Sequence, residues 1–464
     1  MSLWTKRFAA RIFGLVAFEN VLIIAAVAAA VRLRLGWEGW LTFVVENGIG
    51  KTLLISAVCQ LCFYYSDLYE SRAYADRREL CVRLVQGLGA ASFVLAALYF
   101  WFPGLIIGRG VFLIAAVLVV TLLGGWRLLV EWLRRRTAPR ERLLLVGTSA
   151  QAVSLARELF ERRVELGVEI VGFVDPDPSH LGMPVLNPGV IGGIDDIPSI
   201  ASSRGVNRIV VSLADARGKL PMDKLLAMKL NGVQFDHLAS VYEEYTGKIA
   251  VENLRPSWLI FSSGFQKSPL VKTLKRGFDI LSASIGLVFG LPLMMVIAAA
   301  LKLTSQGPVL YHQRRVGRNG RLFNVHKFRS MRVDAEAETG AVWARPDDDR
   351  VTAVGRFLRR TRLDELPQLW NVLTGEMSLI GPRPERPEFV EELTRQIPFY
   401  GERHTVKPGI TGWAQVRYTY GASVEDALEK LQYDLFYIKN LTLTLDLFIF
   451  FDTIKTVILR RGAA

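Results

Sequence analysis

The chain has 464 residues, of which 51% are hydrophobic and 22% charged, and it carries a formal net charge of +13 at pH 7. This length is sufficient for three domains. The mean hydropathy of +0.26 is too high for a wholly soluble protein, whereas the charged share is too high for a protein confined to a bilayer. The positive charge indicates an anionic partner, which could be nucleic acid, phospholipid headgroups or a phosphorylated substrate.

Cysteine usage excludes a disulfide framework, because the only cysteines are Cys59, Cys62 and Cys81 and all lie in or beside apolar runs. Cys59 and Cys62 have the spacing of half a zinc site, but no second pair or histidine is near them in the sequence. We expect them to be small apolar residues of a membrane helix.

Four apolar runs open the chain, at about 13–35, 51–69, 84–102 and 111–133, and each is close to the 20 residues that span a bilayer. The first is too long for a cleavable signal peptide and lacks a cleavage site. Basic residues cluster before the first run, between the second and third, and after the fourth, so both ends of this region are expected in the cytoplasm. Arg32 and Arg34 oppose that assignment. Residues 1–136 are therefore predicted to form a four-helix transmembrane domain.

Residues 137–265 are predicted to form a Rossmann-like α/β domain. Strand-like runs at 142–147, 169–174 and 208–213 alternate with helical segments such as 150–162, which is typical of a parallel sheet. Of the dinucleotide-binding pattern G-x-G-x-x-G only Gly147 is present, although Asp175 and Asp177 could face a ribose. A structural or regulatory role is favoured over dinucleotide binding, which stays open.

Membrane-tethered nucleotide-sugar dehydratases also join membrane helices to a Rossmann unit, but their class requires Tyr-x-x-x-Lys. No tyrosine here is followed by a lysine four positions later, which disfavours that class.

The apolar segment 280–301 is interrupted by Gly290 and Pro292, which should break a helix. Periodicity alone fits a kinked spanning helix as well as two half-helices that enter and leave one leaflet. Eight basic residues follow before position 333, and a spanning helix would place them outside the cell, away from nucleotide donors. We therefore predict a re-entrant helix over about 277–303 with its break at Pro292.

The basic stretch after this segment is predicted to be a hairpin with its turn at Asn319 and Gly320 and a strand carrying Lys327 and Arg329 on one face. Nucleic acid is a disfavoured partner, because no zinc-finger spacing or RNA-binding aromatic motif accompanies the charges. Anionic lipid or a diphosphate substrate fits better.

Two adjacent carboxylates, Asp364 and Glu365, follow an arginine cluster and precede a short helix. Leu366, Leu369, Trp370 and Leu373 form one apolar stripe of that helix, and Pro367 fits its first turn. The pair is thus expected at the helix N-terminus, where anions are favoured. Taken alone, it could be no more than a cap and a first-turn acid.

Four ordered motifs carry a specific resemblance: KFRSM at 327–331, LDELPQLWNV at 363–372, GEMSLIGPRP at 375–384 and KPGITGW at 407–413. They resemble the bacterial sugar transferase family, the monotopic polyprenyl-phosphate phosphoglycosyltransferases, from about Lys272 onward. The rest resembles the long form of that family, in which four transmembrane helices and a Rossmann-like domain precede the catalytic part, here residues 266–464. The layout is similar to the initiating transferases of exopolysaccharide loci, including the exosortase-associated group.

The resemblance implies transfer of a sugar 1-phosphate from a UDP-sugar to a polyprenyl phosphate, commonly undecaprenyl phosphate, with release of UMP and a requirement for magnesium. Asp364 would be the nucleophile and Glu365 the magnesium-associated partner, both serving as metal ligands. Arg383 would contact phosphate, as would Lys327, Arg329 and Arg362. Pro292 matches the helix-breaking proline of the family's re-entrant helix.

The remaining expectations concern location, the acidic loop, the histidines and the closing segment. The protein is expected in the bacterial inner membrane, bound to membrane lipid, with its catalytic domain on the cytoplasmic face. Its oligomeric state stays open, with a homodimer as one candidate. Asp347, Asp348 and Asp349 fit a solvated charge run better than a second metal site, and His312, His326 and His404 lack metal-ligand spacing. The segment 435–459 is amphipathic, broken near Asn440, and expected on the membrane surface.

The competing hypothesis is a catalytically idle membrane scaffold with a nucleotide-sensing Rossmann domain. The identity of the sugar stays open.

Overall fold

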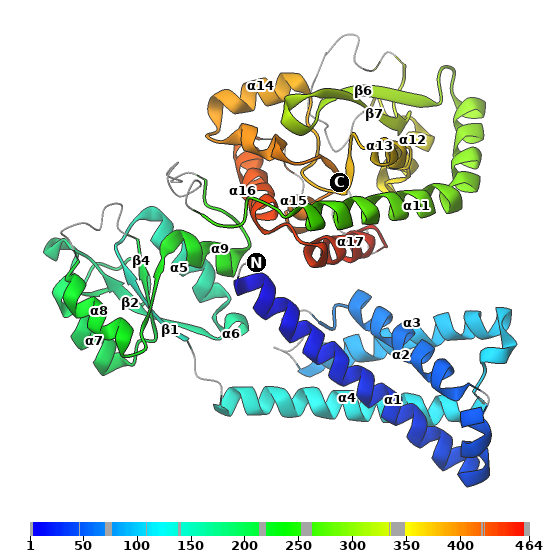
Figure 1. Ribbon diagram of the computed structural model, residues 1–464, viewed down its shortest axis with the longest axis horizontal. Coiled ribbons are helices and arrows are strands. Elements are labelled where there is room, and N and C mark those ends of the chain that lie inside the picture. Colours follow the sequence, from blue (N-terminus) through cyan, green and yellow to red (C-terminus); the bar gives the residue numbers. More distant parts are fainter. Residues whose placement is uncertain are drawn as a thin grey trace. The chain divides into compact units, whose positions relative to one another are not determined.

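The computed structural model describes residues 3–45, 47–69, 77–107, 109–137, 141–212, 220–251, 262–333, 335, 349–418, 421 and 423–458. The chain divides into two compact units, one of Arg7–Val241 and one of Tyr242–Ala464 with the first six residues (Figure 1).

The N-terminal part of the first unit is helical, with a short 3-10 turn between the last two helices. Its elements are α1 Leu3–Val45, α2 Gly48–Tyr65, α3 Arg77–Trp101, η2 Pro103–Leu105 and α4 Arg109–Thr137. Among the described residues, each of these four α-helices contains a segment long and apolar enough to cross a membrane, as does a fifth helix, Pro269–Thr304. These apolar helices indicate a membrane protein. α2 ends four residues earlier than the apolar run suggested, because the chain turns through Asp67 at a φ of 58°.

A cluster of polar side chains around Glu19 and Arg127 joins these helices. Glu19 of α1 and Arg127 of α4 are fully buried and lie 2.6 Å apart. Arg127 also donates to the backbone oxygen of Leu68, and the Tyr69 hydroxyl donates to Glu19. A buried charge in an apolar region requires such pairing, so this cluster fixes α1, α4 and the end of α2 to one another.

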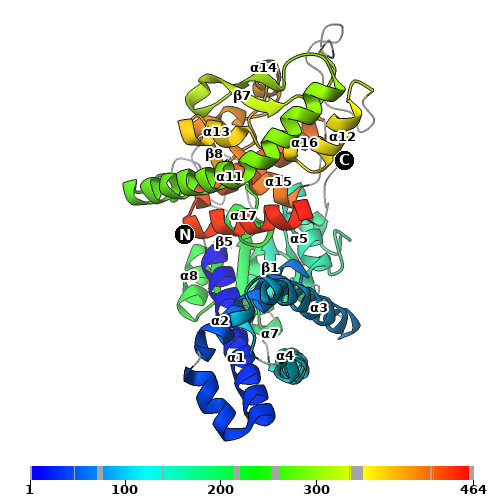
Figure 2. The ribbon, with the colours of Figure 1, turned by 90° about the vertical axis from the view of Figure 1, so that its right-hand side faces the viewer.

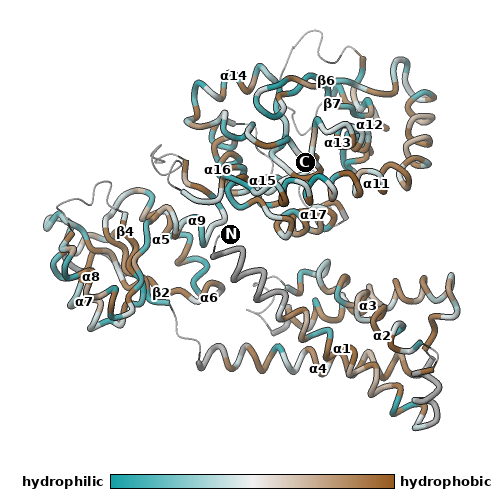
Figure 3. The backbone as a smooth tube through the Cα atoms, in the orientation of Figure 1, coloured by the Kyte–Doolittle hydropathy of each residue, from teal (hydrophilic) through white to brown (hydrophobic). Residues whose placement is uncertain are grey.

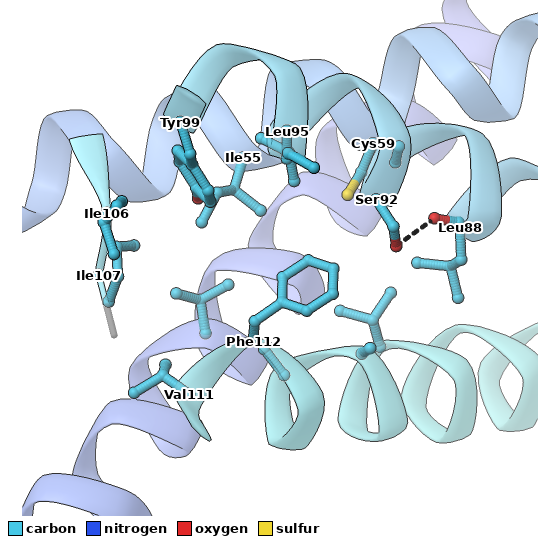
Figure 4. A pocket seen from close by; sticks show the side chains of 16 residues that line it. Ile55, Cys59, Leu88, Ser92, Leu95, Tyr99, Ile106, Ile107, Val111 and Phe112 are labelled. Carbon is cyan, nitrogen blue, oxygen red and sulfur yellow. Dashed lines mark hydrogen bonds between the residues drawn. The ribbon is translucent and has the colours of Figure 1, made fainter. Parts of the chain in front are cut away.

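The same helices line an apolar pocket of about 290 Å³ that is open on one side. Tyr99, Ile55, Leu95 and Phe112 point into it (Figure 4). Of the two hydroxyl-bearing residues in the lining, Ser92 and Tyr99, the former donates to the Leu88 carbonyl of its own helix. The rest of the lining is almost wholly apolar.

The second part of this unit is an α/β domain with a parallel sheet in the order β3-β2-β1-β4-β5. Its strands are β1 Glu141–Val146, β2 Val168–Val174, β3 Val190–Gly192, β4 Arg208–Val211 and β5 Gln234–His237. Its helices are α5 Ala150–Glu161, α6 Arg163–Leu166, α7 Ile197–Arg204 and α8 Met222–Leu230, with 3-10 turns η3 Pro178–His180 and η4 Ile194–Asp196. The four residues from Leu143 to Val146 are fully buried, as a central parallel strand requires. The predicted parallel α/β domain is confirmed.

The second unit contains all four of the sequence motifs that carry the family resemblance. Helix α9 Leu238–Thr246 begins in the first unit and ends in the second. The further helices of the second unit are α11 Pro269–Thr304, α12 Ala353–Arg360, α13 Gln368–Thr374, α14 Pro387–Gln396, α15 Trp413–Arg417, α16 Val424–Asn440 and α17 Leu443–Ile458. Its strands and 3-10 turns are β6 Leu310–Val316, η5 Arg318–Gly320, β7 Leu322–Phe328, η6 Leu363–Glu365, β8 Ser378–Ile380, η7 Tyr400–Thr405 and β9 Gly409–Thr411. The hairpin turn at Asn319 and Gly320 is confirmed, with both residues at positive φ, and so is the helix break near Asn440.

Residues 242–251, which precede α11 in the chain, contribute to the core of this unit. Ile249 and Val251 are buried in its hydrophobic core, and the Ile249 amide donates to the Gln432 carbonyl. The indole of Trp413 donates to the Gly247 carbonyl at 2.9 Å, and Glu243 accepts from Lys439 and Asn440. We call residues 242–251 the linker strap.

Helix α11 is continuous across Pro292, so the predicted break into two half-helices is wrong. Proline removes one backbone hydrogen bond and bends a helix where other contacts hold both sides. A straight helix of 36 residues would be about 54 Å long, but Figures 1 and 2 show α11 bending so that its arms run in different directions.

Both arms of α11 pack on the same unit. Ala283 of the first arm is buried in the main core, and Ile297 and Leu301 of the second arm pack with Phe328 and Leu358. Between them the apolar side chains of Val288, Phe289 and Val296 are at least 66% exposed, and Figure 3 shows hydrophobic residues along much of the helix. The bend therefore presents an apolar tip that the unit itself does not cover.

Candidate active site

The carboxylate pair lies in a tight turn between two short helices. Helix α12 ends at Arg360, Arg362 adopts a left-handed backbone conformation with φ of 59°, and Asp364 and Glu365 form the 3-10 turn η6. Helix α13 begins only at Gln368, with Pro367 at its N-cap. The pair thus stands one turn before the helix N-terminus, not on it, and Pro367 precedes the first helical turn.

The apolar stripe predicted for α13 is only partly correct. Leu369 is buried in the core, and Leu366 and Leu373 pack against it, whereas Trp370 is 56% exposed. Three leucines are enough to seat the helix, so the indole is left on the surface.

Both carboxylates are buried, and each is 7% exposed. Oε1 of Glu365 accepts from Arg383 Nη2 at 2.7 Å and from Lys327 Nζ at 3.2 Å. In the described part of the chain, no donor contacts Oε2 of Glu365 or either oxygen of Asp364. The turn therefore presents one carboxylate held by two cations beside one that is free to react.

Electrostatics separate the two acids. Burial raises the pKa of Asp364, and the neighbouring Glu365 raises it further. Burial alone would also raise the pKa of Glu365, but Arg383, Lys327 and Arg362 hold that pKa well below its ordinary value. Two acids whose environments separate their pKa values in this way are typical of a catalytic site.

Lys327 reaches the pair because Asn371 joins its strand to α13. The fully buried Asn371 donates to the Asn324 carbonyl at 2.8 Å and accepts from the His326 amide at 3.1 Å, both on β7. A second donated bond goes to Glu376. We assigned no role to Asn371 from the sequence, although an amide among apolar helix residues was the available signal.

Arg329 and Lys327 do not share one face as predicted, because β7 ends at Phe328. The guanidinium of Arg329 donates to the carbonyls of Gln306 and Ser305 and to the Ser305 hydroxyl. It therefore caps the C-terminal end of α11 and is not brought to the carboxylates. Arg362, by contrast, is close enough to lower the pKa of Glu365.

The described residues contain no group of three or more histidine, cysteine or acidic side chains arranged to hold a metal ion. His312 and His326 face each other across the hairpin with their Nδ1 atoms 2.6 Å apart, a proximity that their sequence spacing did not reveal. Asp347 and Asp348 lie outside the described residues.

In the α/β domain, Asp175 is engaged within its own fold. Its carboxylate accepts from the Thr148 hydroxyl at 2.6 Å and from the Asp177 amide, and it lies 3.1 Å from His180. The hydroxyls of Ser149 and Ser212 are hydrogen bonded at the ends of β1 and β4. A structural or regulatory role for this domain stays a prediction, and dinucleotide binding stays open.

Comparison with known proteins assigns both parts of the chain. The family described as "Bacterial sugar transferase" matches residues 270–460, and that described as "CoA-binding domain" matches residues 65–220.

Several relatives carry related names. A UDP-N-acetylgalactosamine-undecaprenyl-phosphate N-acetylgalactosaminephosphotransferase of Aeromonas hydrophila is 46% identical over 227 residues, which cover 49% of this chain and 53% of that protein. A UDP-glucose:undecaprenyl-phosphate glucose-1-phosphate transferase of Xanthomonas campestris pv. campestris is 32% identical over 96% of this chain and 93% of that protein. One of the same name from Escherichia coli (strain K12) is 36% identical over 70% of this chain and 69% of that protein. The chain thus spans about half of one relative and nearly the whole length of another, and it belongs to the bacterial sugar transferase family.

Proposed function

We propose that this protein transfers a sugar 1-phosphate from a UDP-sugar to undecaprenyl phosphate and releases UMP, the first membrane step of a glycan assembly. The observation that carries the proposal is the buried pair of Asp364 and Glu365, with Lys327 and Arg383 bound to one member and the other left free. Its placement within a family whose relatives carry such names supports the same reaction.

Asp364 is the proposed nucleophile. A carboxylate oxygen attacks the β-phosphorus of the donor, the bond between that phosphorus and the bridging oxygen breaks, and UMP leaves with the electron pair. An oxygen of the lipid phosphate then attacks the aspartyl phosphosugar and restores the free carboxylate. Each step exchanges one phosphorus–oxygen bond for another.

The cations supply what this chemistry needs most. An anionic nucleophile approaches an anionic diphosphate, so positive groups fixed in advance around the phosphorus lower the barrier. Arg383 has a planar guanidinium that can grip two phosphate oxygens, and Lys327 contributes a second positive charge. Binding both to Glu365 keeps them in place before the donor arrives.

The residues fit magnesium as the resident metal. Mg²⁺ prefers oxygen ligands and commonly takes one or two carboxylates together with substrate phosphates. Asp364 and Oε2 of Glu365 offer such oxygens. When bound, the ion would neutralise charge on the diphosphate.

We place the catalytic unit on the cytoplasmic face of the inner membrane, with α11 entering and leaving the same leaflet. Both arms of α11 pack on one unit, and the apolar tip around Phe289 is uncovered. Charged groups stand at both ends, with Lys275 and Arg276 before the apolar stretch and Lys302 after it. UDP-sugars are made in the cytoplasm, which is where such a site would meet them.

Single cysteines at Leu270 and Leu303, which are 66% and 87% exposed, test this topology after Cys59, Cys62 and Cys81 are replaced by serine. A membrane-impermeant maleimide should label neither position in intact spheroplasts and both after permeabilisation. A cysteine at Phe102, expected outside, is the control for reagent access. Labelling of one end of α11 from outside would show that the helix spans.

The reaction itself is tested with the purified full-length protein, undecaprenyl phosphate and a panel of UDP-sugars that differ at C4 and in N-acetylation. We expect UMP release with at least one donor, dependent on the lipid phosphate and stopped by EDTA. Absence of UMP with every donor would contradict the proposal and favour a scaffold.

A further inference from the structure

The segment that carries Arg383 is held by side chains at three of its backbone oxygens. The Ile380 carbonyl accepts from Lys275 Nζ at 3.0 Å and from the Tyr437 hydroxyl at 3.1 Å. The Arg383 carbonyl accepts from Arg403 Nη2 at 3.1 Å, and the Pro384 carbonyl accepts from Arg315 Nη1 at 3.1 Å. Three cationic side chains and a phenol thus fix a segment of five residues.

Of these three cationic side chains, Arg403 is the one that donates to the backbone carbonyl of Arg383 itself. It comes from η7 and is 6% exposed. Besides the Arg383 carbonyl, its Nη2 lies 2.8 Å from Asp434 Oδ2, and its Nη1 donates to the Tyr400 hydroxyl at 2.5 Å. Asp434 lies on α16 and is 2% exposed.

A purely structural role would be the simpler explanation, but the energetics argue against it. A buried ion pair gains little stability over apolar side chains of the same volume, since desolvation of both charges offsets their attraction. What the pair offers and an apolar cluster does not is a directed hydrogen bond to one chosen carbonyl. That bond goes to the residue whose side chain binds Glu365.

We propose that Arg403, fixed by Asp434 and Tyr400, is a positioning residue that holds the backbone of Arg383 so that its guanidinium meets the donor's diphosphate. The inference rests on the proposed function of Arg383. It extends the site from the carboxylate turn to η7 and α16, neither of which touches the carboxylates.

The test is a double-mutant cycle between positions 403 and 383 in the full-length enzyme. Arg403→Lys keeps the charge opposite Asp434 but cannot reach the Arg383 carbonyl, Asp434 and Tyr400 together. We expect kcat/KM for the UDP-sugar to fall about 10- to 100-fold, the range found when residues that orient a catalytic group are altered. In an Arg383→Ala background the same substitution should change kcat/KM less than twofold, because its target is gone.

The overturning result is equal fold-losses in both backgrounds, which would mean that Arg403 acts independently of Arg383. If turnover of Arg383→Ala is too slow to follow, the same cycle is read from the donor dissociation constant measured by calorimetry. Tyr400→Phe, which removes a single hydroxyl, replaces Arg403→Lys if that variant does not fold, and the same two outcomes apply.

Stability is controlled with Lys439→Met. Lys439 lies on α16, as Asp434 does, and forms a similarly buried ion pair with Glu243 of the linker strap. This pair does not contact the segment 380–384. The melting temperature of the Lys439→Met variant should fall, while its kcat/KM per folded molecule stays at the wild-type value. A loss of kcat/KM in Lys439→Met as large as that in Arg403→Lys would overturn the positioning role. Because every comparison is made within an enzyme that releases UMP, failure of the cycle is distinct from failure of the proposed reaction.

Discussion

Replacing Asp364 by asparagine should lower UMP release by at least about 10³-fold, because an amide cannot form the proposed phosphosugar ester. The substitution changes one atom, so the turn η6 and the contacts of Glu365 with Lys327 and Arg383 should persist. Turnover with a saturating UDP-sugar and undecaprenyl phosphate measures the loss. Wild-type enzyme mixed with donor alone and stopped rapidly should gain the mass of one phosphosugar, and the variant should gain none.

Asp349→Asn is the matched control. Asp349 is exposed and belongs to the acidic run after α11 and the hairpin, where we expect only solvated charges. It should keep wild-type turnover and adduct formation. A peptide map that places the phosphosugar on any side chain other than Asp364, or an Asp364→Asn variant with normal turnover, would refute the proposed mechanism.

Arg383→Lys should reduce kcat/KM for the donor about 10²-fold, although the charge is kept. An ammonium cannot make the two parallel hydrogen bonds that a guanidinium makes to phosphate, and loss of one such donor typically costs about 10²- to 10³-fold in rate. Initial rates of UMP release over a range of donor concentrations measure the change.

Arg395→Lys is the control for the same chemical change. Arg395 pairs with Glu391 on the surface of α14, and both side chains are at least 70% exposed. Surface pairs of this kind contribute little, so the control should match the wild type. Equal activities of the Arg383→Lys and Arg395→Lys variants would show that Arg383 does not bind the donor's diphosphate.

The sequence predicted elements whose signals are local. The run from Leu143 to Val146 is apolar at every position and became the central parallel strand, and the Asn319–Gly320 pair became the hairpin turn. Asp364 and Glu365 were also recognised from a local signal, because the arginine cluster and the short helix that mark them are adjacent to them in the sequence. The packing of the apolar helices on one another and the continuity of α11 through Pro292 depend on contacts that no single segment encodes.

The site was harder to predict where it depends on distant residues. The position of Lys327 beside Glu365 follows from a hydrogen bond between Asn371 and β7. Because β7 ends at Phe328, the side chain of Arg329 lies at the end of α11 and not at the carboxylates. Arg403 is separated from its partners Arg383 and Asp434 by 20 and 31 positions. Spacing in the sequence does not reveal such pairs. Pro292 bends α11 without breaking it because both arms pack on the same unit, the first in its main core and the second in a smaller hydrophobic cluster.

The linker strap has a practical consequence for grafting this catalytic unit onto another protein. Ile249 and Val251 are buried in the hydrophobic core of the catalytic unit. A fusion joined at position 270, where the family match begins, would lack both side chains and leave cavities in that core. Truncation of buried aliphatic side chains typically costs about 2–5 kcal/mol, enough to unfold many domains. Interchange of the preceding α/β domain would therefore succeed only with a junction upstream of Tyr242.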